Sequence, residues 1–365
     1  MSHLSTIHKS EINVLSSKKE IELFIAGIGA VGSTLVCQIT ELTHPGLQFR
    51  VIGACNSKGV EWNPDISRIA TKPQLKPDAP THWDELTEEL IKHSNGNLIF
   101  VDATGSAEVA RQYSKLMKHG VSVVTPSKRA NTFEQVYFDE LQTLNAEHTA
   151  YYRFETTVGA GLPVITTLNQ LLESGDEITK ITGVVSGTMT YLFNQIELNK
   201  PFSSIIEAAK KEGYSEPDPR DDLSGEDVAR KFLIMARTCG FTFERDDIRV
   251  DTLVPEDLID LSLSDFMERI SDYDGHWASR NALVLVNNTR LRYVGTFTPE
   301  GIHVGVQEVP AHSVLGALSG TDNLIEIHTK RYSESPIVIQ GPGAGRSVTA
   351  AGVLSDIVDI GKQLG

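Results

Sequence analysis

The chain has 365 residues, of which 40% are apolar and 22% charged, and its formal net charge is −15 at pH 7. This length favours two domains of roughly 100–200 residues, and the near-average composition excludes a disordered, collagen-like or disulfide-stapled protein. The negative charge argues against a nucleic-acid partner and an anionic membrane, because both need a cationic protein surface, although a small anionic ligand stays compatible with it.

The N-terminal residues and the cysteines indicate the cellular compartment. Residues 1–20 lack the apolar core of a signal peptide and are interpreted as a short polar extension. No stretch approaches the ~18–20 apolar residues that span a bilayer. Cys37, Cys55 and Cys239 are far apart without a CxxC pair, so we interpret them as small core side chains. These features predict a cytoplasmic protein.

The first motif is a glycine turn between a predicted strand and a predicted helix. The apolar run 21–26 leads into GIGAVG (27–32), and apolar residues then recur at helical spacing. In a dinucleotide-binding unit Gly27 allows the tight turn, Gly29 lets the backbone approach a pyrophosphate, and Gly32 lets the helix pack on the sheet. Strands are expected at 48–54, 97–103 and 121–125 and a helix at 107–118, which predicts a doubly wound parallel sheet.

The end of the second strand bears on the choice of cofactor. An acid there would bind the ribose 2′-hydroxyl of NAD, but the sequence is Ala54-Cys55-Asn56-Ser57-Lys58. Lys58, with Arg50 nearby, suits a 2′-phosphate, and the alternative is a solvated loop cation. This pattern favours NADP over NAD.

Polar side chains follow the next two strands. Thr104 and Ser106 come after the strand at 97–103, and Lys128 comes after the strand at 121–125. Carboxyl ends of such strands face the ligand crevice, so Thr104 and Lys128 are candidate cofactor contacts. Ser106 serves equally well as a helix N-cap.

The pattern changes near residue 150. Predicted strands are 150–156, 178–186, a hairpin of 291–298 and 302–309, 323–329 and 335–340; predicted helices are 163–173, 189–197, 205–212, 225–239 and 347–363. Ser204 with Glu207, and Ser224 with Asp227, read as capping boxes for two of these helices. An acidic, proline-containing segment, EPDPRDDLSGED (216–227), precedes the second of them. Asp227 and Lys231 are four residues apart on that helix, so they share one face, as an ordinary surface ion pair also would.

Six segments together resemble homoserine dehydrogenase, over nearly the whole chain from about residue 21. They are the glycine turn, TPSKRAN, ETTVGAGLPV, SGTMTYLF, EGYSEPDPRDDLSGEDVARK and GPGAGRSVTAAGV. The resemblance is to the dehydrogenase portion of bifunctional aspartokinase–homoserine dehydrogenases, although 365 residues leave no room for a kinase. It implies NAD(P)-dependent interconversion of L-homoserine and L-aspartate 4-semialdehyde, in threonine and methionine biosynthesis.

The resemblance also implies a fold and a division into domains. The expected fold is α/β, with a Rossmann-type doubly wound parallel sheet and an α+β catalytic and dimerisation domain. Residues 21–149 and about 333–365 would form the dinucleotide-binding domain, and 150–332 the substrate-binding and dimerisation domain. A homodimer is implied, and the hairpin strands are candidates for pairing with another subunit's sheet.

The family's site residues transfer by motif. Lys231 matches the proposed acid/base lysine, and Asp227 and Lys128 complete the expected catalytic group. The remaining matches are Glu216, Asp222, Asp227 and Thr188 for substrate; Gly27, Gly29, Ala30, Val31, Gly32, Lys58, Thr104, Lys128, Gly213 and Gly345 for cofactor; and Glu155, Val158, Ala160 and Leu162 for a monovalent cation, expected to be sodium. Ser127 replaces the family's usual asparagine.

The expected mechanism places the substrate ammonium among carboxylates and its hydroxyl near the two lysines. A lysine base needs a lowered pKa, which burial or a second cation supplies; the sequence leaves open which lysine carries the proton. Two alternatives remain at this point. An acylating aldehyde dehydrogenase would need a thiolate beside a histidine, and a non-catalytic nucleotide sensor would keep the fold without turnover. None of the 11 histidines lies in an HExxH motif.

Overall fold

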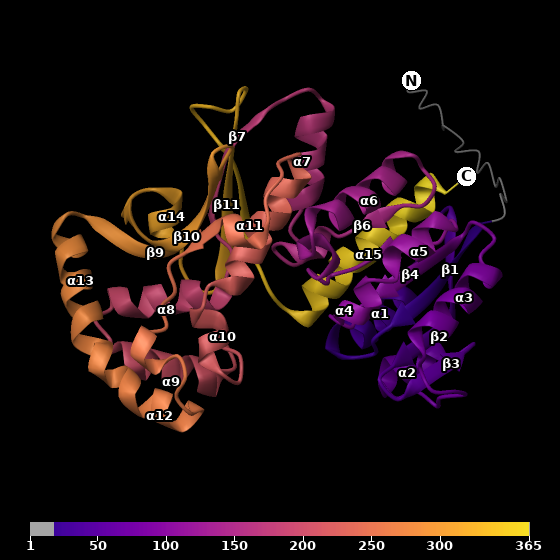
Figure 1. Ribbon diagram of the computed structural model, residues 1–365, viewed down its shortest axis with the longest axis horizontal. Coiled ribbons are helices and arrows are strands. Elements are labelled where there is room, and N and C mark those ends of the chain that lie inside the picture. Colours follow the sequence, from indigo (N-terminus) through magenta and orange to yellow (C-terminus); the bar gives the residue numbers. More distant parts are fainter. Residues whose placement is uncertain (1–17, 365) are drawn as a thin grey trace, which may run out of the picture.

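The computed structural model describes residues 18–364 and contains two six-stranded sheets (Figure 1). The first sheet has the order β3-β2-β1-β4-β5-β6. Its strands are parallel except for the antiparallel pair β2–β3. The bounds are β1 Lys19–Ala26, β2 Leu47–Asn56, β3 Gly59–Trp62, β4 Leu98–Asp102, β5 Ser122–Val124 and β6 Tyr152–Arg153.

Helices cover both faces of this sheet, as a doubly wound fold requires. One face packs on α1 (Ala30–Glu41) and on α15 (Arg346–Gln363), the last helix of the chain, whose buried residues join the same apolar cluster. The other face packs on helices that supply apolar residues to the larger core. These are α3 (Trp83–His93), α5 (Tyr113–Lys118) and α6 (Gln135–Ala146). Two shorter helices, α2 (Ile66–Thr71) and α4 (Ala107–Ala110), complete this part.

The second sheet is mostly antiparallel and has the order β12-β11-β7-β9-β10-β8. Only β8 runs parallel to its neighbour β10. The bounds are β7 Ile178–Val184, β8 Ile248–Val250, β9 Thr289–Thr298, β10 Gly301–Pro310, β11 Asp322–Thr329 and β12 Ile337–Pro342. The α/β fold with a parallel sheet and a second, mixed part is thus confirmed.

Eight helices accompany the second sheet: α7 Val164–Glu173, α8 Gly187–Glu197, α9 Phe202–Glu212, α10 Pro219–Leu223, α11 Glu226–Thr238, α12 Leu263–Arg269, α13 Asp274–Val286 and α14 Val314–Ala317. Most residues of helix α11 are buried, and the helix lies between the two sheets (Figure 1). It packs closely on β9, because a Cβ at Gly295 would overlap the ring of Phe232. This packing fixes the helix that carries Asp227 and Lys231.

The structure corrects several predicted elements. Residues 107–118 form two short helices that break at Arg111–Gln112, and the strand expected at 150–156 is confined to Tyr152–Arg153. The acidic segment that precedes the predicted helix 225–239 contains α10, with Pro219 in its first turn. Strand β12 pairs with β11, so the chain returns to the first sheet only after Pro342, later than the expected position near 333. Of the predicted N-terminal extension, residues 1–17 lie outside the described residues, while Lys19 and Glu20 already belong to β1.

Both capping boxes are wrong. Helix α9 begins after Pro201, and the hydroxyl of Ser204 donates to the carbonyl of Pro201 rather than capping. Helix α11 begins after Gly225, and the carboxylate of Asp227 bonds to lysines. The start of α9 thus lies outside the predicted box, whereas α11 starts within it but has Gly225 rather than Ser224 as its N-cap.

The hairpin strands β9 and β10 belong to the second sheet, and their pairing with another subunit's sheet stays a prediction. Strand β9 has neighbours on both sides, and β8 covers part of β10, at Ile302–Val304. In the described part of the chain no helix is both long and apolar enough to cross a membrane.

Candidate active site

The glycine turn after β1 has the geometry that its three glycines predict. Gly27 has φ +93°, and a Cβ there would lie 2.7 Å from the carbonyl of Ala103. At Gly32 a Cβ would overlap the carbonyl oxygen of Gly27, whereas Gly29 faces open space. Gly29 is the N-cap of α1, whose first two residues are Ala30 and Val31. Backbone N–H groups at this helix start are therefore available to an anion such as a pyrophosphate.

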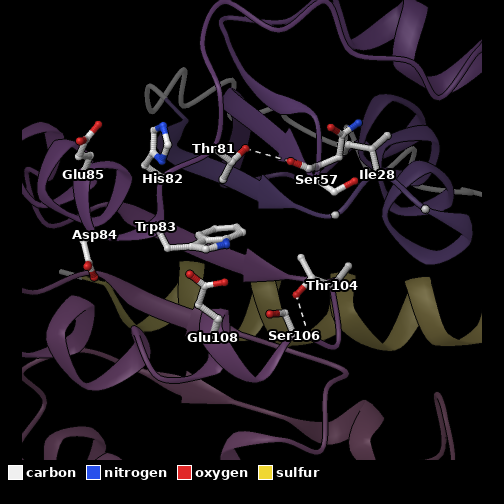
Figure 2. Close-up of a pocket in the computed structure, with 14 residues that line it drawn as sticks. Ile28, Ser57, Thr81, His82, Trp83, Asp84, Glu85, Thr104, Ser106 and Glu108 are labelled. Carbon is white, nitrogen blue, oxygen red and sulfur yellow. Dashed lines mark hydrogen bonds between the residues drawn. The ribbon is translucent and has the colours of Figure 1, made fainter.

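A cavity of about 980 Å³ opens over this turn (Figure 2). Its lining comes from the carboxyl ends of β1, β2 and β4 and from the start of α3. A second hollow of about 320 Å³ shares Ala103 and Thr104 with the first and extends to Lys128 and Asp227. The two hollows thus form a groove from α3 to α11, at the sheet edge where such folds bind dinucleotides.

Three charged side chains meet at the α11 end of the groove. The carboxylate of Asp227 lies 2.7 Å from Nζ of Lys231 and 3.2 Å from Nζ of Lys128. Lys231 is 8% exposed, and its Nζ also donates to the backbone carbonyl of Val185 at 2.6 Å. The predicted i, i+4 pair is therefore more than a surface ion pair, because one partner is buried and a second lysine joins it.

The charges in this group shift one another's ionisation. Burial lowers the pKa of Lys231 and nearby Lys128 lowers it further, while Asp227 opposes both effects. Desolvation disfavours the ionised form of Asp227, but the two ammonium groups outweigh it, so its pKa lies well below the usual range. A lysine with a lowered pKa beside an ionised aspartate is suited to accept and return a proton.

A second polar group joins the start of α8 to the acidic segment. The hydroxyl of Thr188 lies 2.6 Å from the carbonyl of Tyr214 and 3.1 Å from Oδ1 of Asp222. The other oxygen of Asp222 accepts the backbone N–H of Glu216 at 2.8 Å. Burial raises the pKa of Asp222, and the charges of Glu216 and Asp227 add to it. Such a site would favour a cationic ligand.

Several candidate cofactor contacts lie away from the cavity linings. Lys58 is in the β2–β3 turn, where its N–H donates to the side chain of Asn56, and Arg50 is ion-paired with Glu20 and Glu22. The partners of Arg50 lie on the amino-terminal half of β1, and its role beside Lys58 stays a prediction.

The two remaining candidate glycines each lie at the end of a helix, one at a C-terminus and one at an N-terminus. Gly213 ends α9 in the left-handed region, with φ +75°. Gly345 precedes α15, with φ +128°. Neither glycine is among the residues that line the groove.

The segment expected to bind a cation forms a turn between β6 and α7. Ala160 has φ +52° within it, and Val158 is buried. Both carboxylate oxygens of Glu155 accept N–H groups at the start of α7, at 2.7 and 2.8 Å, and the carbonyl of Leu162 accepts from Val164 at 2.9 Å. Glu155 lies beside a second buried carboxylate, Asp356 of α15, which accepts its backbone N–H at 3.1 Å.

The carboxyl of Asp356 has a raised pKa. Its own burial and the neighbouring charge of Glu155 raise its pKa well above the usual range. Among residues 18–364 no group of three or more His, Cys, Asp or Glu could hold a metal ion. Any cation at this turn would need backbone carbonyls as ligands.

Sequence reasoning missed the far wall of the groove. Thr81, His82, Trp83, Asp84 and Glu85 line it, and Figure 2 shows the indole of Trp83 inside the cavity opposite Thr104 and Ser106. This segment follows no predicted strand, so its only signal is a helix start with two acids in the first turn.

The cysteines offer no activated nucleophile. Burial raises the pKa of Cys55 and Cys239 to about 12. The charge of Glu41 raises the pKa of Cys37 on α1. An acylating aldehyde dehydrogenase needs a thiolate at neutral pH, so this alternative is disfavoured.

Comparison with protein families gives two matches. Residues 27–155 match the family described as "Homoserine dehydrogenase, NAD binding domain", and residues 163–358 match "Homoserine dehydrogenase". The homoserine dehydrogenase of Saccharomyces cerevisiae is 34% identical, with 95% of this chain and 100% of the yeast protein aligned. A chloroplastic bifunctional aspartokinase/homoserine dehydrogenase of Zea mays is 38% identical over 96% of this chain. The chain spans 39% of the length of that relative.

Solved structures share the fold. A Candida auris protein described as of unknown function has a TM-score of 0.88 at 34% identity, covering 95% of this chain and 99% of that one. A hyperthermophilic archaeal homoserine dehydrogenase in complex with NADPH has a TM-score of 0.74 at 24% identity, covering 95% and 99%.

Proposed function

The chain belongs to the homoserine dehydrogenase family, and we propose from this membership and from its own site that it interconverts L-homoserine and L-aspartate 4-semialdehyde with NAD(P). The observation that carries the proposal is the buried Lys231, bonded to Asp227 at the end of a groove that begins at the glycine turn. A nucleotide sensor would have no use for a buried lysine with a lowered pKa at that position.

Lys231 is proposed to move the proton. In its neutral form the amine has two N–H groups and one lone pair. The bonds to Asp227 and Val185 use both N–H groups, which leaves the lone pair for the hydroxyl of homoserine. A bound nicotinamide would supply the hydride acceptor for the carbon that bears this hydroxyl. In the reverse direction the third N–H of the ammonium form donates to the aldehyde oxygen.

The carboxylates of the acidic segment are proposed to hold the substrate's ammonium. Asp222 and Glu216 lie next to each other, and Thr188 bonds to the same carboxylate. Because Asp222 is partly desolvated and faces other negative charges, a bound ammonium would stabilise its ionised form. Lys128, ion-paired with Asp227, lines the α11 end of the groove.

The proposal includes NADP as the preferred cofactor and accepts NAD. Its support is the residue at the end of β2, which is Asn56 where an NAD-selective site has an acid. Lys58 in the adjoining turn is the residue that we propose for the 2′-phosphate.

The proposal also includes a monovalent cation and a homodimer. The turn with Val158, Ala160 and Leu162 supplies carbonyls beside two buried carboxylates, Glu155 and Asp356, and an added cation would reduce their mutual repulsion. Dimerisation would cover the remaining edges of the second sheet. The proposed domain division assigns 21–149 and the C-terminal helix to cofactor binding, and the segment from 150 to β12 to substrate binding and dimerisation.

The test is spectrophotometric. The purified chain is mixed with L-homoserine and NADP⁺ or NAD⁺, and reduced nicotinamide is followed by its absorbance. We expect turnover with both nucleotides, a higher kcat/KM with NADP⁺, and none when homoserine is replaced by L-2-aminobutyrate, which lacks the hydroxyl. Nucleotide binding without turnover would favour the sensor instead.

A further inference from the structure

A buried hydrogen-bonded network lies beneath the groove, at the ends of β4 and β5. Its members are Asp102, Tyr113 and Thr125, all three with no exposed surface. The phenol of Tyr113 bonds to Oδ2 of Asp102 and lies 3.1 Å from the hydroxyl of Thr125. The hydroxyl of Thr125 is in turn 3.0 Å from the backbone carbonyl of Asp102. The three groups therefore form a closed ring.

Each end of the ring holds one loop of the proposed active site. Oδ1 of Asp102 accepts the backbone N–H of Thr104 at 2.7 Å and its hydroxyl at 2.6 Å. Thr104 lines both hollows of the groove. On the other side, the hydroxyl of Thr125 accepts the N–H of Ser127 at 2.9 Å, and Ser127 directly precedes Lys128. The ring thus connects the cofactor loop to the loop that carries Lys128.

The backbone alone does not make this connection. Strands β4 and β5 pair over three residues and the pairing stops at Val101 and Val124. Beyond that point the N–H of Ala103 bonds to β1, and the N–H of Thr125 bonds to Arg153. Side chains must therefore set the separation of the two loops.

The carboxylate of Asp102 is a buried acceptor shared by the ring and the cofactor loop. The hydroxyl of Tyr113 donates to its Oδ2, and the N–H and hydroxyl of Thr104 donate to its Oδ1. Burial raises the pKa of Asp102, while the bonds from Thr104 and Tyr113 oppose this effect. Burial also raises the pKa of the Cys55 thiol, to about 12.

We propose that Tyr113 is a positioning residue that fixes Lys128 relative to the cofactor loop. This inference rests on the proposed function. The charged groups around Nζ of Lys231 are Asp227, Asp222 and Lys128. Of these, Lys128 disfavours the ammonium form, so a displaced Lys128 would let the pKa of Lys231 rise.

The test compares Tyr113→Phe with Tyr137→Phe. Tyr137 is 9% exposed, and its hydroxyl donates to the carbonyl of Ala110 at 2.6 Å, outside the ring. For Tyr113→Phe we expect kcat for homoserine oxidation to fall about fivefold and the dissociation constant of NADPH to rise about threefold, as expected for the loss of one buried hydrogen bond. The pH at which kcat/KM reaches half its alkaline plateau should increase. Tyr137→Phe should change none of the three.

Unchanged kinetics and NADPH binding in Tyr113→Phe would overturn the inference, and so would equal changes in Tyr137→Phe. An enzyme without turnover on homoserine would contradict the proposed function, but the NADPH titration of the two variants would still decide this point. Should Tyr113→Phe fail to fold, Thr125→Val opens the ring at its other hydroxyl, and an unshifted pH profile in that variant would also overturn the inference.

Discussion

The ion pair of Lys231 and Asp227 differs from an ordinary surface pair because Lys231 is buried. An exposed i, i+4 pair contributes only a few tenths of a kcal/mol, and the spacing of Asp227 and Lys231 predicts no more than that. The structure adds what spacing cannot contain: a buried ammonium, the carbonyl of Val185 and a second lysine from the loop after β5. These contacts join residues more than 40 positions apart, so the sequence alone predicts the pair and leaves its partners open.

Replacing Lys231 with Met should lower kcat by about 10²–10⁴-fold, the usual contribution of a positioned general acid or base. Binding of NADPH should stay within about twofold, because Lys231 is outside the lining of the groove. Steady-state rates and a fluorescence titration check both. Lys211→Met, on the exposed face of α9, is the matched control and should leave both unchanged; a Lys231→Met enzyme that keeps its turnover would contradict the assignment.

The pH dependence of homoserine oxidation should report the charges around Lys231. Oxidation needs the neutral amine, so the rate should rise with pH through a pKa below the ordinary lysine value of about 10.4. Lys128→Met removes a cation that lowers this pKa, so the profile should move to higher pH. Asp227→Asn removes an anion that raises it, so the profile should move to lower pH. Shifts in the same direction in both variants would contradict the proposed charge arrangement.

At the scale of single elements, the start of α11 depends on a glycine. Gly225 has φ +78°, and a Cβ there would overlap the hydroxyl of Tyr293. Gly213 at the end of α9 has nearly the same φ, +75°, but open space around it. The two positions therefore separate backbone strain from steric overlap.

Gly225→Ala should lower the free energy of unfolding by about 2–4 kcal/mol, through strain of ~1 kcal/mol and overpacking of ~1–3 kcal/mol. Gly213→Ala should lose only the strain, about 1 kcal/mol. Denaturant unfolding measures both values. Because α11 carries Asp227 and Lys231, kcat should also fall in the first variant; equal destabilisation of the two variants would contradict the packing described for α11.

Helix α15 should make the stability depend on pH and on sodium. The folded-state pKa of Asp356 is raised, so its contribution is complete below the ordinary pKa of about 3.9 and is lost as pH rises towards the folded value. Asp356→Asn should therefore raise the melting temperature at neutral pH and flatten its decline with pH. If sodium binds at the adjoining turn, exchange of choline chloride for sodium chloride should stabilise the wild type more than the variant. A melting temperature that Asp356→Asn lowers at neutral pH would contradict this account.

The sequence predicts an element well when local pattern determines it, and poorly when tertiary packing does. The turn at Gly27 and the strands beside it depend on local pattern, and the sequence predicts them closely. Both capping boxes fail because several polar residues near each start can cap, and tertiary packing selects the start. The segment with Trp83 is missed for a related reason, since it forms the groove wall only when the chain folds over the end of β2.

At the scale of the whole molecule, the net charge of −15 is unevenly distributed. Asp222 and Glu216 belong to the acidic segment that we propose for the substrate ammonium, whereas Lys128 and Lys231 lie where the proposed mechanism places the reacting hydroxyl. Helix α11 connects these regions because it lies between the two sheets (Figure 1). The alternation of strands and helices predicts the first sheet well, but the order of the second sheet depends on long-range pairing that no local pattern contains.

The most direct test of the central claim is the stoichiometry of the reaction. L-Homoserine and NADP⁺ are incubated with the protein, reduced nicotinamide is measured by absorbance, and L-aspartate 4-semialdehyde is trapped as a hydrazone and quantified. The account predicts one aldehyde for each nicotinamide reduced, and loss of both products in Lys231→Met. Reduced nicotinamide without the aldehyde, or no reduction by a protein that binds NADPH, would contradict it.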